Sequence, residues 1–125
     1  MKVLIVDDEK DIQSLFEQCF RREIRSGELE LVFAFSGEEA LNFMKIHEHE
    51  AILILSDINM PGMSGLELLK NIKEKYETPL PIMMMITAYG DNVNYQNALR
   101  LGADDFLTKP IDFTSLKDKL KALIA

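Results

Sequence analysis

Charged and polar side chains follow four apolar runs of the sequence, each at the point where the run ends. Asp7 and Asp8 follow the first run, Asp57 the third, Thr87 the fourth and Lys109 the fifth. Carboxylate oxygens suit Mg²⁺, and three carboxylates brought together repel one another unless a cation lies among them. If these side chains converge, they form a site for Mg²⁺ and phosphoryl transfer. If they do not, they are solvated acids at loop ends.

Five short apolar or β-branched runs must position these residues. They alternate with stretches of helical periodicity, a pattern typical of βα units. The first, third and fourth runs are apolar throughout, as interior strands of a parallel sheet are, whereas the second alternates and is expected at an edge. We predict strands at residues 3–6, 29–35, 51–56, 82–86 and 105–107. Because ligands bind at the carboxyl ends of parallel strands, the polar residues should share one site.

Serine caps and apolar stripes locate the helices. Ser36 and Ser64 each stand three residues before a glutamate, as in a capping box, and so predict two helix starts. A further helix is expected at residues 91–101, ending at Gly102. The first helix is expected at residues 10–25, with an apolar face made of Leu15, Phe16, Cys19, Phe20 and Ile24. Together these elements predict an α/β fold, a three-layer sandwich of five βα units.

Length and composition limit the classes of function. The chain has 125 residues, which suits a single domain spanning residues 1–125 and leaves no room for an output domain. Its 14 basic and 21 acidic residues give a net charge of −7, which disfavours direct binding to nucleic acid. No apolar run approaches the length of a membrane helix, and one cysteine cannot form an internal disulfide. We therefore expect a cytoplasmic protein that does not bind membranes.

Four sequence blocks resemble the receiver domain of two-component response regulators. They are VLIVDDE at residues 3–9, LSDINMPGMSG at 55–65, ITA at 86–88 and GADDFLTKP at 102–110. The resemblance covers essentially the whole chain. It implies the flavodoxin-like strand order 2-1-3-4-5 and a switch that is activated by phosphorylation, with no external substrate.

The resemblance also implies a role for each acidic residue. Asp57 would accept the phosphoryl group from a histidine kinase or a histidine phosphotransfer protein. Asp8 and Asp57 would bind Mg²⁺, or Mn²⁺ in its place, directly, whereas Asp7 would hold the metal through water. The backbone carbonyl of Asn59 would be a further ligand.

The remaining motif residues would bind the phosphoryl group and couple phosphorylation to a conformational change. Lys109, aimed by a cis bond to Pro110, would pair with Asp57 and then with the phosphoryl oxygens, and Thr87 would donate a hydrogen bond to them. Phe106 occupies the aromatic switch position where many relatives have tyrosine, so it can rotate but offers no phenolic hydrogen bond. The output would pass through residues 91–124 to an unknown domain or protein, with the chain as a monomer or a phosphorylation-dependent dimer.

Two further sets of residues are expected to tune the switch. Asn59 and Tyr89 lie where relatives flank the path of the hydrolytic water, and the bulky Tyr89 should slow dephosphorylation. The kinase is expected to dock on Asp11, Ile12, Leu15 and Pro110. For Ile12 an equally good interpretation is that it tops the core stripe of the first helix.

Other interpretations of the sequence stay open at this point. A small Mg²⁺-dependent phosphatase could use Asp57 or Asp7 as nucleophile, although the chain has no insertion to bind a substrate. A pseudo-receiver would bind a partner without being phosphorylated. The methionines at residues 83–85 are expected to pack in the core, Cys19 to be a reduced core thiol, and His47 and His49 to lie at a solvated helix end.

Overall fold

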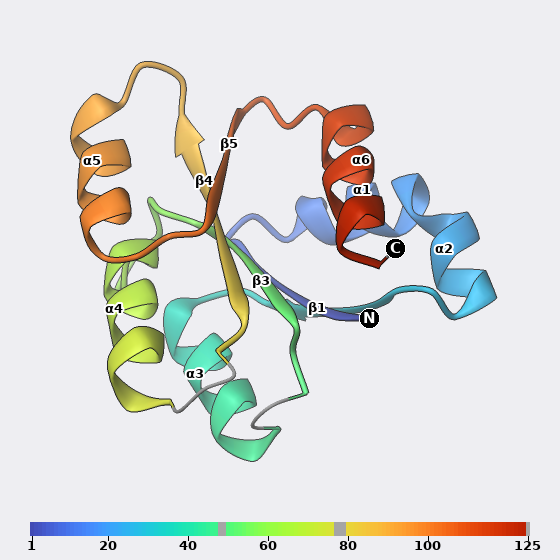
Figure 1. Cartoon of the computed structure of the whole chain (residues 1–125), viewed down its shortest axis with the longest axis horizontal. Coiled ribbons are helices and arrows are strands. Elements are labelled where there is room, and N and C mark those ends of the chain that lie inside the picture. The colour runs from blue at the N-terminus through green and yellow to red at the C-terminus, as the bar shows by residue number, and fades with distance from the viewer. Residues whose placement is uncertain (48–49, 77–79, 125) are drawn as a thin grey trace.

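A computed structural model gives the structure of the chain and describes residues 1–47, 50–76 and 80–124. Its centre is a parallel sheet of five strands in the order β2-β1-β3-β4-β5, with β2 at an edge (Figure 1). The strands are β1 (Lys2–Val6), β2 (Glu30–Ala34), β3 (Leu53–Asp57), β4 (Ile82–Ala88) and β5 (Asp105–Lys109). The predicted fold class, strand order and edge strand are confirmed.

Helices cover both faces of the sheet (Figure 1). One face carries α3 (Gly37–Ile46), α4 (Gly65–Lys75) and α5 (Asn92–Arg100), and the other carries α1 (Asp11–Cys19) and α6 (Phe113–Ile124), with α2 (Arg21–Ser26) beyond them. The predicted caps are present, because the Ser36 and Ser64 hydroxyls accept hydrogen bonds from the amides of Glu39 and Glu67. Asp91 caps α5 in the same way.

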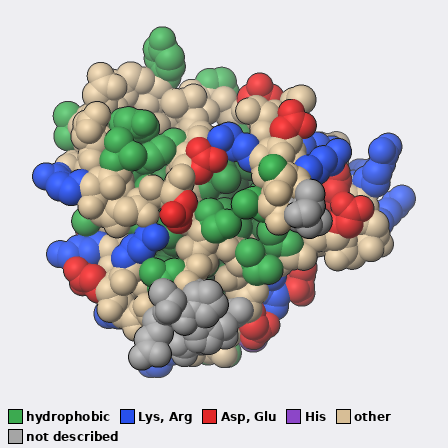
Figure 2. Space-filling view, viewed as in Figure 1, with side chains coloured by type: hydrophobic (Ala, Val, Ile, Leu, Met, Phe, Trp, Pro, Cys, Tyr) green, Lys and Arg blue, Asp and Glu red, His purple; other side chains and the backbone are tan. Residues whose placement is uncertain are grey.

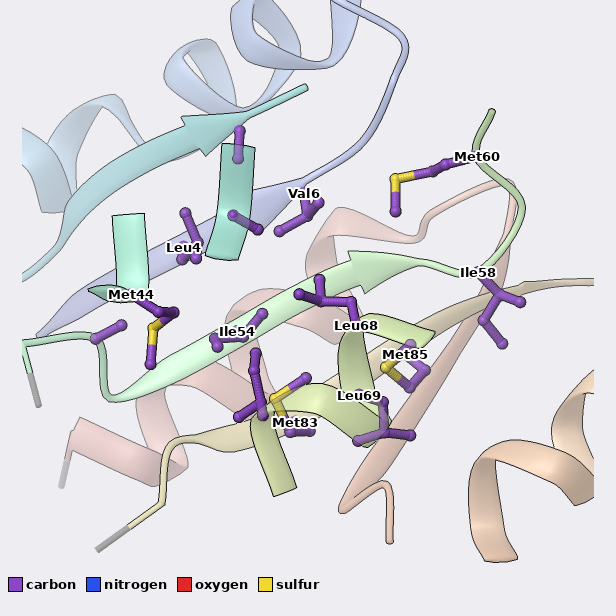
Figure 3. Close-up of a cluster of buried hydrophobic side chains, with 14 of the residues drawn as sticks. Leu4, Val6, Met44, Ile54, Ile58, Met60, Leu68, Leu69, Met83 and Met85 are labelled. Carbon is purple, nitrogen blue, oxygen red and sulfur yellow. The ribbon is translucent and has the colours of Figure 1, made fainter. Parts of the chain in front are cut away.

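Two apolar cores lie between the layers. Side chains alternate along each strand, so Leu4, Met83 and Met85 face α3, α4 and α5 (Figure 3), whereas Met84 faces α1 and α6. All three methionines are buried, which confirms that they pack in the core. Cys19 is half-buried against the α1 and α6 core and is a free thiol. His47 ends α3 and lies 2.7 Å from Glu50, whereas His49 is outside the described residues.

The prediction of one continuous first helix is wrong. Phe20 has non-helical dihedral angles (φ −108°, ψ 20°) and separates α1 from α2. Its ring is buried together with that of Phe16. Glu23 is buried and Ile24 is 36% exposed, while Leu15, beside Phe16 at the edge of the stripe, is 46% exposed.

Candidate functional site: an acidic cluster at the strand ends

Three carboxylates meet at the carboxyl edge of the sheet, as the sequence predicts. Asp57 is the last residue of β3, and Asp7 follows β1, which is paired in register with β3. Asp7 and Asp57 are buried and Asp8 is exposed, and their carboxylate oxygens lie within 4.8 Å of one another. The helix that follows β3 starts very close to this edge, because a Cβ on Gly65 would lie 2.1 Å from the backbone oxygen of Asp57. Only glycine fits there.

Lys109 brings a positive charge to the cluster from the end of β5. Its Nζ donates a hydrogen bond to Oδ2 of Asp57 at 2.8 Å and lies 4.0 Å from Oδ2 of Asp7. The bond between Lys109 and Pro110 is cis, as the resemblance implies. One lysine among three carboxylates leaves the cluster with two uncompensated negative charges when all three are ionised.

Burial and charge perturb two groups of the cluster. The pKa of Asp7 is raised mainly because burial disfavours the ionised form, and the charge of Asp57 adds to this effect. The amide of Glu9 donates a hydrogen bond to Oδ1 of Asp7 at 2.9 Å and partly opposes the rise. Burial lowers the pKa of Lys109, but the hydrogen bond to Asp57 and the charges of Asp57 and Asp7 outweigh it, so the net shift is upward.

This donor set fits a divalent cation of the Mg²⁺ type. All three clustered side chains offer hard carboxylate oxygens. The charge left over after Lys109 is of the size that one divalent cation would neutralise. Asp8 is exposed, so a partly hydrated ion could reach the cluster from solvent.

The expected switch residues lie on β4 and β5. Thr87 is buried near the end of β4, and Phe106 is half-buried in β5 against the core beneath α3, α4 and α5. The ring of Tyr95, on α5, lies 4.5 Å from that of Phe106, measured between centroids. Sequence reasoning missed Tyr95, which is 37% exposed and stands one turn after the Asp91 cap.

The two expected tuning residues have different surroundings. The amide of Asn59 donates to Oδ1 of Asp57 at 3.4 Å, and its side-chain oxygen accepts from Nδ2 of Asn94 at 3.5 Å. Nδ2 of Asn94 also donates to Oδ2 of Asp91 at 2.7 Å, so the α5 cap is linked to the loop after β3. Tyr89 is 88% exposed. Sequence reasoning also missed Asn94, which has no motif to mark it.

Three of the four expected docking residues lie together. Ile12, Leu15 and Pro110 line a cavity of about 520 Å³ whose wall also includes Asp7 and Lys109. Asp11 is exposed at the start of α1 and is not part of this wall. Ile12 is half-buried and packs against the α1 and α6 core, so it is part of the core stripe as well as the cavity wall.

The sequence of the chain matches the family model of the response regulator receiver domain over residues 3–121. The chain belongs to this family. The receiver domain assigns it to two-component signalling and supports a phosphorylation-activated signalling switch. Among the described residues, no helix is both long and apolar enough to span a membrane.

Solved structures of response regulators are similar to the chain over nearly its whole length. A receiver domain protein from Clostridium thermocellum is 27% identical, with 98% of this chain and 93% of that chain covered and a TM-score of 0.83. A chemotaxis response regulator of Vibrio cholerae is 29% identical, with 98% and 97% covered and a TM-score of 0.76. A two-component response regulator from Clostridium difficile is 27% identical, with 99% and 95% covered and a TM-score of 0.81.

Proposed function

We propose that this receiver domain accepts a phosphoryl group on Asp57 from a histidine kinase or a histidine phosphotransfer protein. The observation that carries the proposal is the position of Asp57, buried at a strand end within hydrogen-bonding distance of Lys109 and beside two further carboxylates. A carboxylate oxygen of Asp57 would attack phosphorus while the bond to the donor imidazole nitrogen breaks. Asp57 is preferred to Asp7 as the nucleophile because Nζ of Lys109 lies 2.8 Å from Oδ2 of Asp57 but 4.0 Å from Oδ2 of Asp7.

Mg²⁺, or Mn²⁺ in its place, is the proposed cofactor. Asp8 and Asp57 would bind it directly, Asp7 would bind it through water, and the backbone carbonyl of Asn59 would complete the protein ligands. When bound, the ion supplies positive charge to the phosphoryl oxygens. Lys109 supplies the same kind of stabilisation from the end of β5, because its Nζ is already 2.8 Å from Oδ2 of Asp57.

The proposed output of the switch is the face made by α5, β5 and α6. The Thr87 hydroxyl would donate a hydrogen bond to the phosphoryl group, and the space it leaves would admit the ring of Phe106. The contact with Tyr95 would then change, which couples the site to α5. Figure 2 shows hydrophobic side chains exposed on this side of the molecule, and those of α5 and α6 include Val93, Tyr95, Leu99 and Leu123. Such side chains suit an unknown output partner or a phosphorylation-dependent dimer.

The cavity beside Lys109 is the proposed docking site of the kinase or phosphotransfer protein. Ile12, Leu15 and Pro110 offer apolar contacts next to Asp57, and Asp11 lies at the exposed start of α1. We place the protein in the cytoplasm, where such donors act, and assign it no binding to nucleic acid or membranes, in keeping with its net charge of −7. Residues 1–125 are taken as one domain.

Incubation with acetyl phosphate and Mg²⁺ tests this function. The parent should gain one phosphoryl group per chain, measured as a shift in intact mass, and the gain should be lost with EDTA or in Asp57→Asn. Asp118→Asn, an exposed aspartate on α6, is the matched control and should label normally. Absence of labelling would favour a pseudo-receiver, and sustained turnover of p-nitrophenyl phosphate would favour a phosphatase.

A further inference from the structure

A second cavity, of about 740 Å³, lies between the α1–α2 segment and α6. None of the residues of the acidic cluster lines it. Its volume falls within the range of small-molecule sites in proteins. It is independent of the proposed phosphorylation site, and nothing in the signalling function accounts for it.

The wall of this cavity is basic although the chain as a whole is acidic. Figure 2 shows Lys and Arg side chains gathered over α2. Five cations and one carboxylate give the wall a formal charge of +4, in a chain whose net charge is −7. These residues are Arg21, Arg22, Arg25, Lys117, Lys121 and Glu23. Cations concentrated in one hollow attract phosphate groups, and Arg pairs with them through two hydrogen bonds at once.

Glu23 is the one acidic residue of the wall, and its carboxylate is incompletely paired. The residue is 7% exposed, and its Oε1 is buried without a hydrogen-bond partner among the described residues. Oε2 lies 3.8 Å from Nζ of Lys117, beyond hydrogen-bonding distance, and that Nζ also lies 5.6 Å from the centre of the Phe20 ring. A buried acceptor without a donor is unfavourable, so a ligand that offers donors to Glu23 would be favoured.

Glu23 lies on the inward side of α2. It is buried, whereas the next residue, Ile24, is 36% exposed. The exposed Arg21, Arg22 and Arg25 line the cavity on the α2 side, and Lys117 and Lys121 line it from α6.

We propose that this cavity binds a nucleoside phosphate, with guanine as the preferred base. The basic residues would hold the phosphates, and an arginine could stack on the base through its planar guanidinium group. Guanine presents two adjacent N–H groups on one edge, which match the two oxygens of Glu23. Lys117 covers Glu23 in the structure, and it would move from Glu23 to a phosphate as the base enters.

An acidic peptide is a poorer occupant of the same cavity. Its carboxylates would pair with the cations of the rim but would be repelled by Glu23, which they would have to approach. A nucleotide satisfies both parts of the wall, because it carries anionic and donor groups at opposite ends.

Calorimetric titration of the full chain with GDP, ADP and pyrophosphate tests the proposal. EDTA is included so that a metal-bound nucleotide cannot occupy the acidic cluster. GDP should bind more tightly than ADP and pyrophosphate. Arg22→Glu and Lys121→Glu, on opposite walls, should each lower the affinity for GDP by about tenfold or more, because each reverses a charge that pairs with phosphate. Lys45→Glu, the same change at an exposed position of α3, should leave GDP affinity unchanged.

Glu23→Gln distinguishes the contribution of the base to binding from that of the phosphates. It should remove the preference for GDP over pyrophosphate while pyrophosphate binds as well as before or better. Amide shifts of the parent on addition of GDP should be confined to α1, α2 and α6. Absence of GDP binding, equal affinity for GDP and pyrophosphate in the parent, or shifts centred on the acidic cluster would overturn the proposal. An acidic peptide that displaces GDP and binds more tightly would also overturn it.

Discussion

Replacing Asp8 by asparagine should stabilise the metal-free protein and remove most of its response to Mg²⁺. Asp8 is the exposed member of the acidic cluster, and its carboxylate oxygens lie within 4.8 Å of those of Asp7 and Asp57. The change removes one negative charge and keeps the shape of the side chain. Two repulsive pairs are therefore lost in the absence of metal, and one proposed metal ligand is lost in its presence.

The size of the gain follows from these distances. Two unit charges 4.8 Å apart interact by about 3.5 kcal/mol at an effective dielectric constant near 20. Asp8 is exposed, and solvent and salt reduce such interactions to about 1 kcal/mol or less for each pair. We therefore expect a gain of about 1 to 2 kcal/mol in the free energy of unfolding without metal, or about 4 to 8 °C in Tm. For the parent, Mg²⁺ at a hundredfold excess over Kd should contribute about 2.7 kcal/mol.

Thermal unfolding followed by circular dichroism measures both effects. The parent, Asp8→Asn and the control Asp118→Asn are each melted in EDTA and in excess Mg²⁺. Asp8→Asn should melt highest in EDTA and gain least from Mg²⁺, whereas the control should behave as the parent. A lower metal-free Tm for Asp8→Asn, or a full Mg²⁺ response, would refute the electrostatic account of the cluster.

Three further predictions concern the site and its output. The pKa of Asp7 is raised in the fold, so its ionised form destabilises the protein at neutral pH and the loss is recovered as the pH falls through that raised pKa. In EDTA, Asp7→Asn should thus have a higher free energy of unfolding than the parent at neutral pH, measured by urea unfolding. The difference should shrink on acidification, and a constant difference would contradict this. Thr87→Ala should still be phosphorylated, but beryllofluoride should shift the amides of residues 91–124 less than in the parent, and a full response would mean that the coupling takes another route. Tyr89→Ala should shorten the lifetime of the phosphorylated state, measured by loss of the mass label, because the exposed ring would no longer obstruct the hydrolytic water; an unchanged lifetime would count against shielding.

The sequence predicts the sheet and the acidic cluster because both depend on local patterns. Apolar runs mark the buried strands, serine caps mark α3 and α4, and parallel strands bring their carboxyl ends to one edge. Asp7, Asp57 and Lys109 therefore meet as expected, although they are far apart in the chain. The family resemblance added the roles of these residues, which no periodicity contains.

The sequence does not predict features that depend on how helices pack. The stripe in residues 10–25 is equally compatible with a straight helix, and only the backbone dihedral angles of Phe20 show where it breaks. The burial of Glu23, the exposure of Leu15 and the basic cavity depend on how α1, α2 and α6 pack together. The contact between Tyr95 and Phe106 likewise depends on the position of α5 over β5.

The location of the phosphoryl group tests the central claim most directly. The protein is treated with acetyl phosphate and Mg²⁺, the acyl phosphate is reduced with borohydride, and the modified residue is identified by peptide mass spectrometry. We predict that the reduced residue is Asp57, with no modification in Asp57→Asn. A label on Asp7 or Asp8 in the parent would contradict the assignment of Asp57 as the phosphoacceptor.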